Sequence, residues 1–259
     1  RPRLPLWAAV SGGRGRGGFG KVNRYSLCFW EGDQNVTFDQ YDGLASSVVG
    51  LLSGGISGIA LNHSDLGGHT SMYNDMWDLR RSKELLWRWA ELSAFTPVYR
   101  PHDGSMQDCN HQFYDDAQST RFFGLMGRLH QMLYPLFAQL EEEAAEKGYP
   151  VIRHTLMHDT LAANEDLRYQ YMLGADVAFF PVWQEGASQV EGYIPSGRWI
   201  DPWNGTVYEG GKKVMLSAPL GKPAVLLRKD SLWEKRLMPA FRDFMDQERE
   251  TYRLLPEKL

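Results

Sequence analysis

Short apolar runs alternate with segments of helical periodicity along the first part of the chain. Residues 25–30 and 56–62 are largely apolar, which predicts two short buried strands. Residues 42–52 and 81–95 carry apolar side chains about every 3.6 positions, and residues 115–147 keep this spacing for longer. We therefore expect two helices of ordinary length and one long helix. Strands and helices that alternate in this way are typical of parallel α/β units.

The pattern changes in the second part of the chain. The long helix should end at Gly148, and Pro135 should kink it or divide it. Residues 149–156 return to a strand pattern, and residues 167–173 are predicted to form a short helix. The following β-type runs are separated by turns rich in Gly and Pro, which predicts an all-β sandwich; they are 177–182, 190–194, 198–200, 206–208, 213–216 and 224–227.

Composition narrows the classes of function. Hydrophobic residues make up 43% of the chain and charged residues 23%, with a formal net charge of -4, as in an ordinary globular protein. Nucleic-acid-binding domains usually carry a clear basic excess, so no nucleic-acid partner is expected. No run of about 18 apolar residues occurs, so no membrane span is expected. Cys28 lies in an apolar run and is predicted to be a small buried hydrophobe.

Three polar loops directly follow predicted strands. The first carries Asp33, the second His63 and Asp65, and the third Arg100 and His102. Functional side chains of parallel α/β barrels come from loops at the carboxyl ends of strands, so these residues are candidates for a common site. Each of them is also compatible with an ordinary solvated turn. No pair of His or Cys has metal-site spacing and no glycine-rich phosphate loop follows a strand, so neither a metal nor a cofactor is expected.

Four segments together resemble glycoside hydrolase family 31 in order and spacing. They are RGGF at 16–19, FWEGDQ at 29–34, NHSDLGG at 62–68 and RPHDG at 100–104. The Gln after Gly-Asp, the His-Ser-Asp before Gly-Gly and the RSKELL run at 81–86 are similar to the sulfoquinovosidase branch of that family. The resemblance covers about residues 16–235, which is nearly the whole chain.

The resemblance implies an α/β fold, namely the C-terminal part of a (β/α)8 TIM barrel followed by an all-β sandwich domain. Residues 16–176 would form the C-terminal half of the catalytic barrel, and residues 177–259 would form the sandwich. Residues 1–15 are expected to be an irregular N-terminal segment.

The resemblance also implies a retaining hydrolase of α-glycosides, which works with two carboxyl groups. Asp33 matches the family's general acid/base, which must be protonated near neutral pH to assist the leaving group. Arg16, Trp30 and His102 match residues that bind the substrate. The family's nucleophile is an Asp in an Asp-Phe-x-Glu-like motif on an earlier strand. No such motif precedes Asp33 in this sequence, so the chain alone is expected to be inactive.

His69 stands where sulfoquinovosidases carry a Tyr directly after Gly-Gly. We expect it to donate a hydrogen bond to the sulfonate of the substrate. Extra residues follow before Arg81, so Tyr73 is an alternative donor. Asp65 and Gln34 are expected to hold neighbouring loop groups in place.

Two alternatives remain beside hydrolysis of α-sulfoquinovosides. One is an α-glucosidase or α-xylosidase of the same family, and the other is a non-catalytic carbohydrate-binding remnant that lacks the nucleophile. In all three cases the expected partner is a small carbohydrate. The sequence leaves the oligomeric state and the compartment open.

Overall fold

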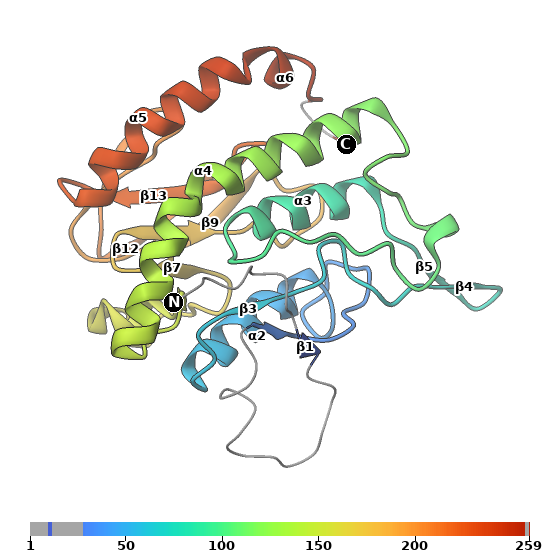
Figure 1. The fold of residues 1–259 in the computed structure, drawn as a ribbon, viewed down its shortest axis with the longest axis horizontal. Coiled ribbons are helices and arrows are strands. Elements are labelled where there is room, and N and C mark those ends of the chain that lie inside the picture. The colour runs from blue at the N-terminus through green and yellow to red at the C-terminus, as the bar shows by residue number, and fades with distance from the viewer. Residues whose placement is uncertain (1–9, 12–27, 257–258) are drawn as a thin grey trace, which may run out of the picture.

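The computed structural model describes residues 10–11, 28–256 and 259 (Figure 1). Its first sheet has three parallel strands in the order β1 (Val10–Ser11), β2 (Phe29–Trp30) and β3 (Asn62–His63). Phe29 is paired with Asn62 and Trp30 with His63, so β2 and β3 end side by side. The strand predicted at 56–62 is shorter than expected and ends one residue later, because the preceding helix continues to Ile56 and residues 57–61 form a turn and irregular chain.

Three helices accompany this sheet: α2 (Leu44–Ile56), α3 (Lys83–Ala94) and α4 (Ala117–Lys147). The side chain of Ser82 accepts a hydrogen bond from the backbone of Leu85 at the start of α3, and Asp116 caps α4 in the same way. Gly148 closes α4 with a φ of 77°, as predicted. α4 runs through Pro135 as one helix, so the helix is not divided there.

The second sheet has six antiparallel strands. Their spatial order is β11 (Val207–Glu209), β10 (Arg198–Ile200), β13 (Ala224–Arg228), β8 (Val177–Phe180), β7 (Tyr171–Leu173) and β6 (Ile152–Arg153). The helix predicted at 167–173 is therefore wrong: residues 167–170 form a turn and irregular chain, and the backbone of Tyr171–Leu173 pairs with β6 and β8. The domain boundary predicted after residue 176 falls between the paired strands β7 and β8; it stays a prediction.

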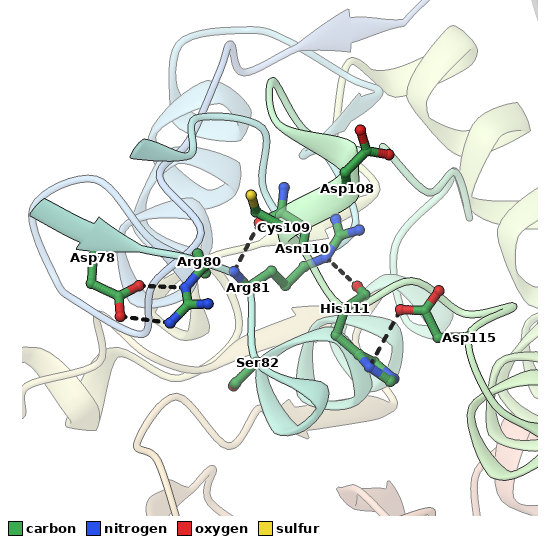
Figure 2. A pocket seen from close by; sticks show the side chains of 9 residues that line it. All are labelled: Asp78, Arg80, Arg81, Ser82, Asp108, Cys109, Asn110, His111 and Asp115. Carbon is green, nitrogen blue, oxygen red and sulfur yellow. Dashed lines mark hydrogen bonds and ion pairs between the residues drawn. The ribbon is translucent and has the colours of Figure 1, made fainter. Parts of the chain in front are cut away.

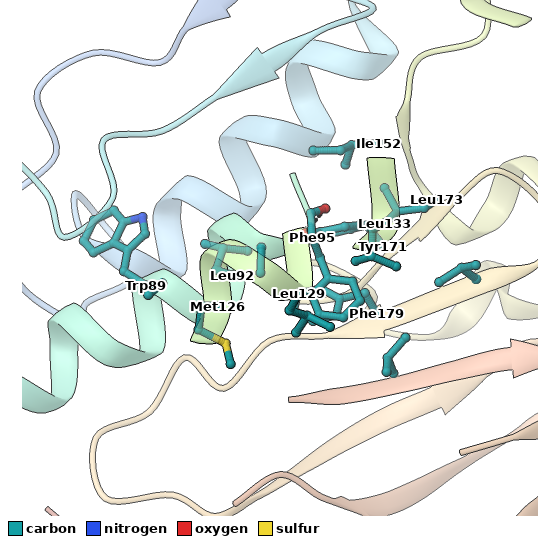
Figure 3. Packing of buried hydrophobic residues seen from close by; sticks show 14 of the residues in the cluster. Trp89, Leu92, Phe95, Met126, Leu129, Leu133, Ile152, Tyr171, Leu173 and Phe179 are labelled. Atoms are coloured by element: carbon teal, nitrogen blue, oxygen red, sulfur yellow. Dashed lines mark hydrogen bonds between the residues drawn. The ribbon is translucent and has the colours of Figure 1, made fainter. Parts of the chain in front are cut away.

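Successive residues along the strands of this sheet point to opposite faces, and each face packs against a different part of the molecule. Tyr171 and Phe179 lie on the side of α3 and α4, where the ring of Phe179 stacks on Phe95 with centroids 4.2 Å apart (Figure 3). Phe180 lies on the opposite side, which is covered by a separate ribbon of β9 (Gln189–Ile194) and β12 (Lys212–Ser217). The sheet is thus buried on both faces.

Further elements complete the molecule. The chain after the last strand forms α5 (Leu232–Gln247) and α6 (Arg249–Arg253), two helices that the sequence analysis did not predict. β4 (Met72–Asn74) and β5 (Trp77–Leu79) form an exposed hairpin, and three 3-10 turns are η1 (Gln107–Cys109), η2 (Thr155–Met157) and η3 (Thr160–Asn164). In the part of the chain that the structure describes, every helix is too short or too polar to cross a membrane. Cys28 is buried, as predicted.

Candidate active site

The loops after β2 and β3 are joined by their backbones. The carbonyl oxygen of Gln34 accepts hydrogen bonds from the backbone N–H groups of His69, at 2.8 Å, and Thr70, at 2.9 Å. The N–H of Val36 in turn donates to the carbonyl of Thr70 at 3.1 Å. This extra parallel pairing continues the two strands beyond their ends and fixes Asp33 beside the loop that carries His69.

Asp33 and His69 face one another at the mouth of this loop pair. Oδ1 of Asp33 lies 3.5 Å from Nδ1 of His69, and half of the Asp33 side chain, 51%, is exposed. The positive φ of Gly32, 101°, turns the chain between the half-buried end of β2 and this exposed carboxylate. Asp33 therefore lies beside the imidazole ring of His69 and is open to a ligand.

His102 joins them from the third loop. Its ring meets the ring of His69 edge to face, with centroids 4.6 Å apart. Nδ1 of His102 accepts a hydrogen bond from the backbone N–H of Gly104 at 3.0 Å, so the neutral ring carries its proton on Nε2. Burial lowers the pKa of His102, which favours this neutral form. His102 can thus donate a hydrogen bond from Nε2.

Asp65 is fully buried and forms an ion pair with Arg100, whose side chain is 38% exposed. Its Oδ1 accepts a hydrogen bond from Arg100, whose Nε donates to Nε2 of His63 at 3.4 Å. Nδ1 of His63 is 3.1 Å from the carbonyl oxygen of Phe29, to which it donates. Burial and the nearby Arg100 lower the pKa of His63, so this ring is held neutral. The chain of contacts ties the third loop to β2 through Asp65, and the supporting role of Asp65 stays a prediction.

Arg81 holds two of these loops together, and the sequence analysis did not identify this role. Its guanidinium donates to the carbonyl oxygens of His102, at 2.6 Å, and His111, at 2.9 Å, and to Oε1 of Gln112, at 2.5 Å. A longer contact of 3.4 Å reaches the carbonyl of Gly67. In the sequence, Arg81 stood out only because it begins the RSKELL run at 81–86 that is similar to the sulfoquinovosidase branch.

An open pocket of about 600 Å³ lies beside Arg81 (Figure 2). Arg80, the preceding residue, points away from the buried guanidinium and pairs with Asp78 through two contacts of 2.6 and 2.7 Å. Two neighbouring arginines therefore have opposite surroundings, one buried between loops and one exposed at the foot of the hairpin.

The remaining predicted residues occupy different positions. Arg16 lies outside the described residues. Trp30 and Gln34 lie at the end of β2 and in the loop after it. Within the described part of the chain, Nε1 of Trp30, Oε1 of Gln34 and Oδ2 of Asp65 are buried without a hydrogen-bond partner. Such atoms are uncommon in folded proteins, and these three belong to the end of β2 and to the loops that carry Asp33 and His69. Tyr73 is exposed on the hairpin strand β4.

Two family models match this chain. The model described as the glycosyl hydrolases family 31 TIM-barrel domain matches residues 14–136, and that of the glycosyl hydrolase family 31 C-terminal domain matches residues 148–232. The chain belongs to glycosyl hydrolase family 31. The predicted resemblance and the predicted fold class, part of a TIM barrel followed by a C-terminal domain, are thereby confirmed.

Relatives from this family extend the comparison. The sulfoquinovosidase of Escherichia coli K12 is 40% identical over 219 residues, which are 84% of this chain and 32% of that protein. Alpha-glucosidase 2 of Bacillus thermoamyloliquefaciens is 30% identical over 217 residues, covering 83% of this chain and 26% of the relative. A solved GH31 sulfoquinovosidase from E. rectale, in complex with the aza-sugar inhibitor IFGSQ, superposes with a TM-score of 0.78 at 37% identity, covering 86% of this chain and 32% of that one. The chain thus spans about a third of the length of the sulfoquinovosidases that it matches.

Proposed function

We propose that this chain contributes the acid/base half of the active site of a retaining α-glycosidase, and that its substrates are α-sulfoquinovosides. The observation that carries the proposal is the paired loops that place Asp33 beside His69 and His102, at the carboxyl end of a parallel strand of a family 31 protein. The higher identity to a sulfoquinovosidase, 40%, than to an α-glucosidase, 30%, supports the choice of substrate.

Asp33 has the role of general acid and then general base. Its exposed carboxyl group would protonate the glycosidic oxygen as the bond to the anomeric carbon breaks, and would then take a proton from the attacking water. A retaining reaction needs a second carboxylate about 5–5.5 Å away as the nucleophile. The family motif for that residue does not precede Asp33 in this sequence, so we expect the nucleophile to come from another part of a longer protein.

His69 and His102 would bind the glycone. His102 carries its free proton on Nε2, which suits a hydrogen bond to a sugar hydroxyl. Nδ1 of His69 faces the carboxylate of Asp33 at 3.5 Å, so the ring lies beside the acid/base. A protonated imidazole gives a charge-assisted hydrogen bond to a sulfonate oxygen. Trp30 would pack beside the same sugar, and Asp65 would keep Arg100 in place beneath it.

The test compares Asp33→Asn with Asp75→Asn in the full-length protein that contains this chain. Asp75 lies exposed at the tip of the hairpin, so its replacement controls for the loss of one surface carboxylate. We expect Asp33→Asn to abolish release of sulfoquinovose from an alkyl α-sulfoquinovoside, whose poor leaving group needs protonation. Azide should rescue turnover of 4-nitrophenyl α-sulfoquinovoside and yield the α-glycosyl azide, while Asp75→Asn should behave as the parent.

Each part of the proposal has its own contrary result. Equal activity of Asp33→Asn and the parent on the alkyl glycoside would assign the acid/base role to another residue. Faster cleavage of 4-nitrophenyl α-glucoside or α-xyloside than of the sulfoquinovoside would favour the alternative substrates. A full-length protein that binds sulfoquinovose but cleaves none of these glycosides would favour the non-catalytic alternative.

A further inference from the structure

A second cleft of about 440 Å³ lies in the C-terminal part of the chain. Its walls come from the β9–β12 ribbon, from residues 166 and 168–170 before β7, and from residues 183–184 after β8. Gln40, seven positions after Asp33, is its one contribution from the first half of the described chain. None of the residues around Asp33 described above lines this cleft, so it is built from a different set of side chains than the candidate active site.

An aromatic pair forms one wall. The rings of Tyr169 and Trp183 stack with centroids 4.2 Å apart at an interplanar angle of 27°, and both side chains are half-buried. The guanidinium of Arg168 lies 5.5 Å from the ring centre of Tyr169. Tyr and Trp offer large apolar faces together with a polar edge, and such faces suit the C–H-rich faces of sugar rings.

The opposite wall is a rigid polar surface. Alternation along the ribbon places Val190 and Leu216 in the core, while their neighbours Gln189, Glu191 and Met215 face outward into the cleft. The ribbon is fixed from below because a buried amide, Gln170, is bonded to the backbone N–H and carbonyl of Tyr193 at 2.9 and 2.8 Å. The exposed amide of Gln184 adds a further donor and acceptor.

The charges in and beside the cleft are largely paired with one another. Lys213 lies 3.1 Å from Glu165, and Arg168 forms a two-point pair with Asp166 at 2.9 and 2.7 Å. Glu191 adds one more negative charge, so the cleft has no cationic excess that would attract a sulfonate or phosphate. An aromatic platform opposite amides and paired charges favours an uncharged ligand with many hydroxyl groups.

We propose that this cleft is a second carbohydrate-binding site, which holds a neutral saccharide away from Asp33. The site goes beyond the proposed hydrolysis, because it recognises sugar without a charged group. A pyranose ring packs against the exposed part of the aromatic pair, and the exposed side chains of Gln40, Gln184 and Gln189 exchange hydrogen bonds with its hydroxyls.

Titration calorimetry on the full-length protein tests this site with three neutral probes: maltotriose, cellotriose and xylotriose. We expect binding of at least one of them. Trp183→Ala and Tyr169→Ala should weaken it by about tenfold or more, since the stacking surface is lost. Met215→Arg should also weaken it, by placing a long side chain in the cleft from a position that is 54% exposed and outside the core.

Controls separate this site from the other surfaces. Trp77→Ala removes an exposed Trp from the hairpin and should leave binding unchanged, as should Asp33→Asn. Inorganic sulfate should not compete. The proposal is overturned if none of the three probes binds at millimolar concentration, if binding survives Met215→Arg and Tyr169→Ala alike, or if Asp33→Asn abolishes it. These outcomes do not depend on whether sulfoquinovosides are cleaved.

Discussion

Replacing Arg81 by Met should destabilise the protein far more than the same change at the neighbouring Arg80. Arg81 is 2% exposed, and its guanidinium satisfies the acceptors of His102, His111 and Gln112. Burial lowers the pKa of Arg81 to about 10, so the group is still charged at neutral pH. Met fills much of the same volume but donates no hydrogen bond, which leaves these acceptors without their partner.

The size of the loss follows from those acceptors. Each buried polar group left unpaired costs about 1–3 kcal/mol, and the costs are not fully additive because some of the carbonyls gain access to water from the open pocket. We therefore expect Arg81→Met to lower the free energy of unfolding by about 3–5 kcal/mol, a large share of the ~5–15 kcal/mol typical of a domain. Arg80 and Asp78 form their pair in solvent, so Arg80→Met should have a much smaller effect.

Urea unfolding, followed by tryptophan fluorescence at neutral pH, measures both variants. The midpoint of Arg81→Met should fall well below that of Arg80→Met with an unchanged slope. Arg81→Lys should recover only part of the difference, because an ammonium lacks the planar fork that reaches several acceptors. Equal midpoints for the two Met variants would refute the idea that Arg81 ties the loops together.

Two other predictions concern a buried carboxyl group and a closely packed glycine. Burial raises the pKa of Glu31 well above its ordinary value, and both carboxyl oxygens lack a partner within the described residues. The folded state therefore holds the carboxyl proton of Glu31 more tightly than the unfolded state does. The stability of the fold should fall as pH rises above the ordinary pKa of Glu. Urea midpoints across pH 5 to about 8 should show this fall in the parent and a weaker one in Glu31→Gln; parallel curves would contradict it. Gly192→Ala should destabilise the folded state by about 1–3 kcal/mol, because the new Cβ would lie 2.2 Å from the ring of Phe180. Gly127→Ala in α4 is the matched control. Its new Cβ would meet Tyr99 only at 3.5 Å, so this change should stabilise the helix by up to about 1 kcal/mol. Thermal unfolding of both variants checks the signs, and a stabilised Gly192→Ala would rule out the clash.

Most residues of the candidate site could be selected from the sequence, but their arrangement in space could not. Asp33, His69 and His102 were selected through polar loops after apolar runs and through their match to family motifs. Their approach to one another depends on backbone pairing between residues about 35 positions apart, such as Gln34 with His69. The supporting role of Arg81 was missed for the same reason, since its partners lie in loops far along the chain.

The helices were determined locally. α3 and α4 follow from their apolar spacing, from the capping side chains of Ser82 and Asp116 and from Gly148, all of which act within one or two turns. α5 also carries a local signal, because Trp233 and Phe241 lie on one face, but the preceding series of short strands led to an all-β expectation there.

Tertiary structure decided the rest. Tyr171–Leu173 fits either a short helix or a strand, and it became β7 because pairing with β6 and β8 satisfies its backbone while Tyr171 fills the core. The cleft beside Tyr169 and Trp183 likewise exists only once the β9–β12 ribbon is placed against them. By itself the sequence determined the elements whose stabilising contacts lie a few residues apart; only the folded chain could decide those whose partners are brought together from distant segments.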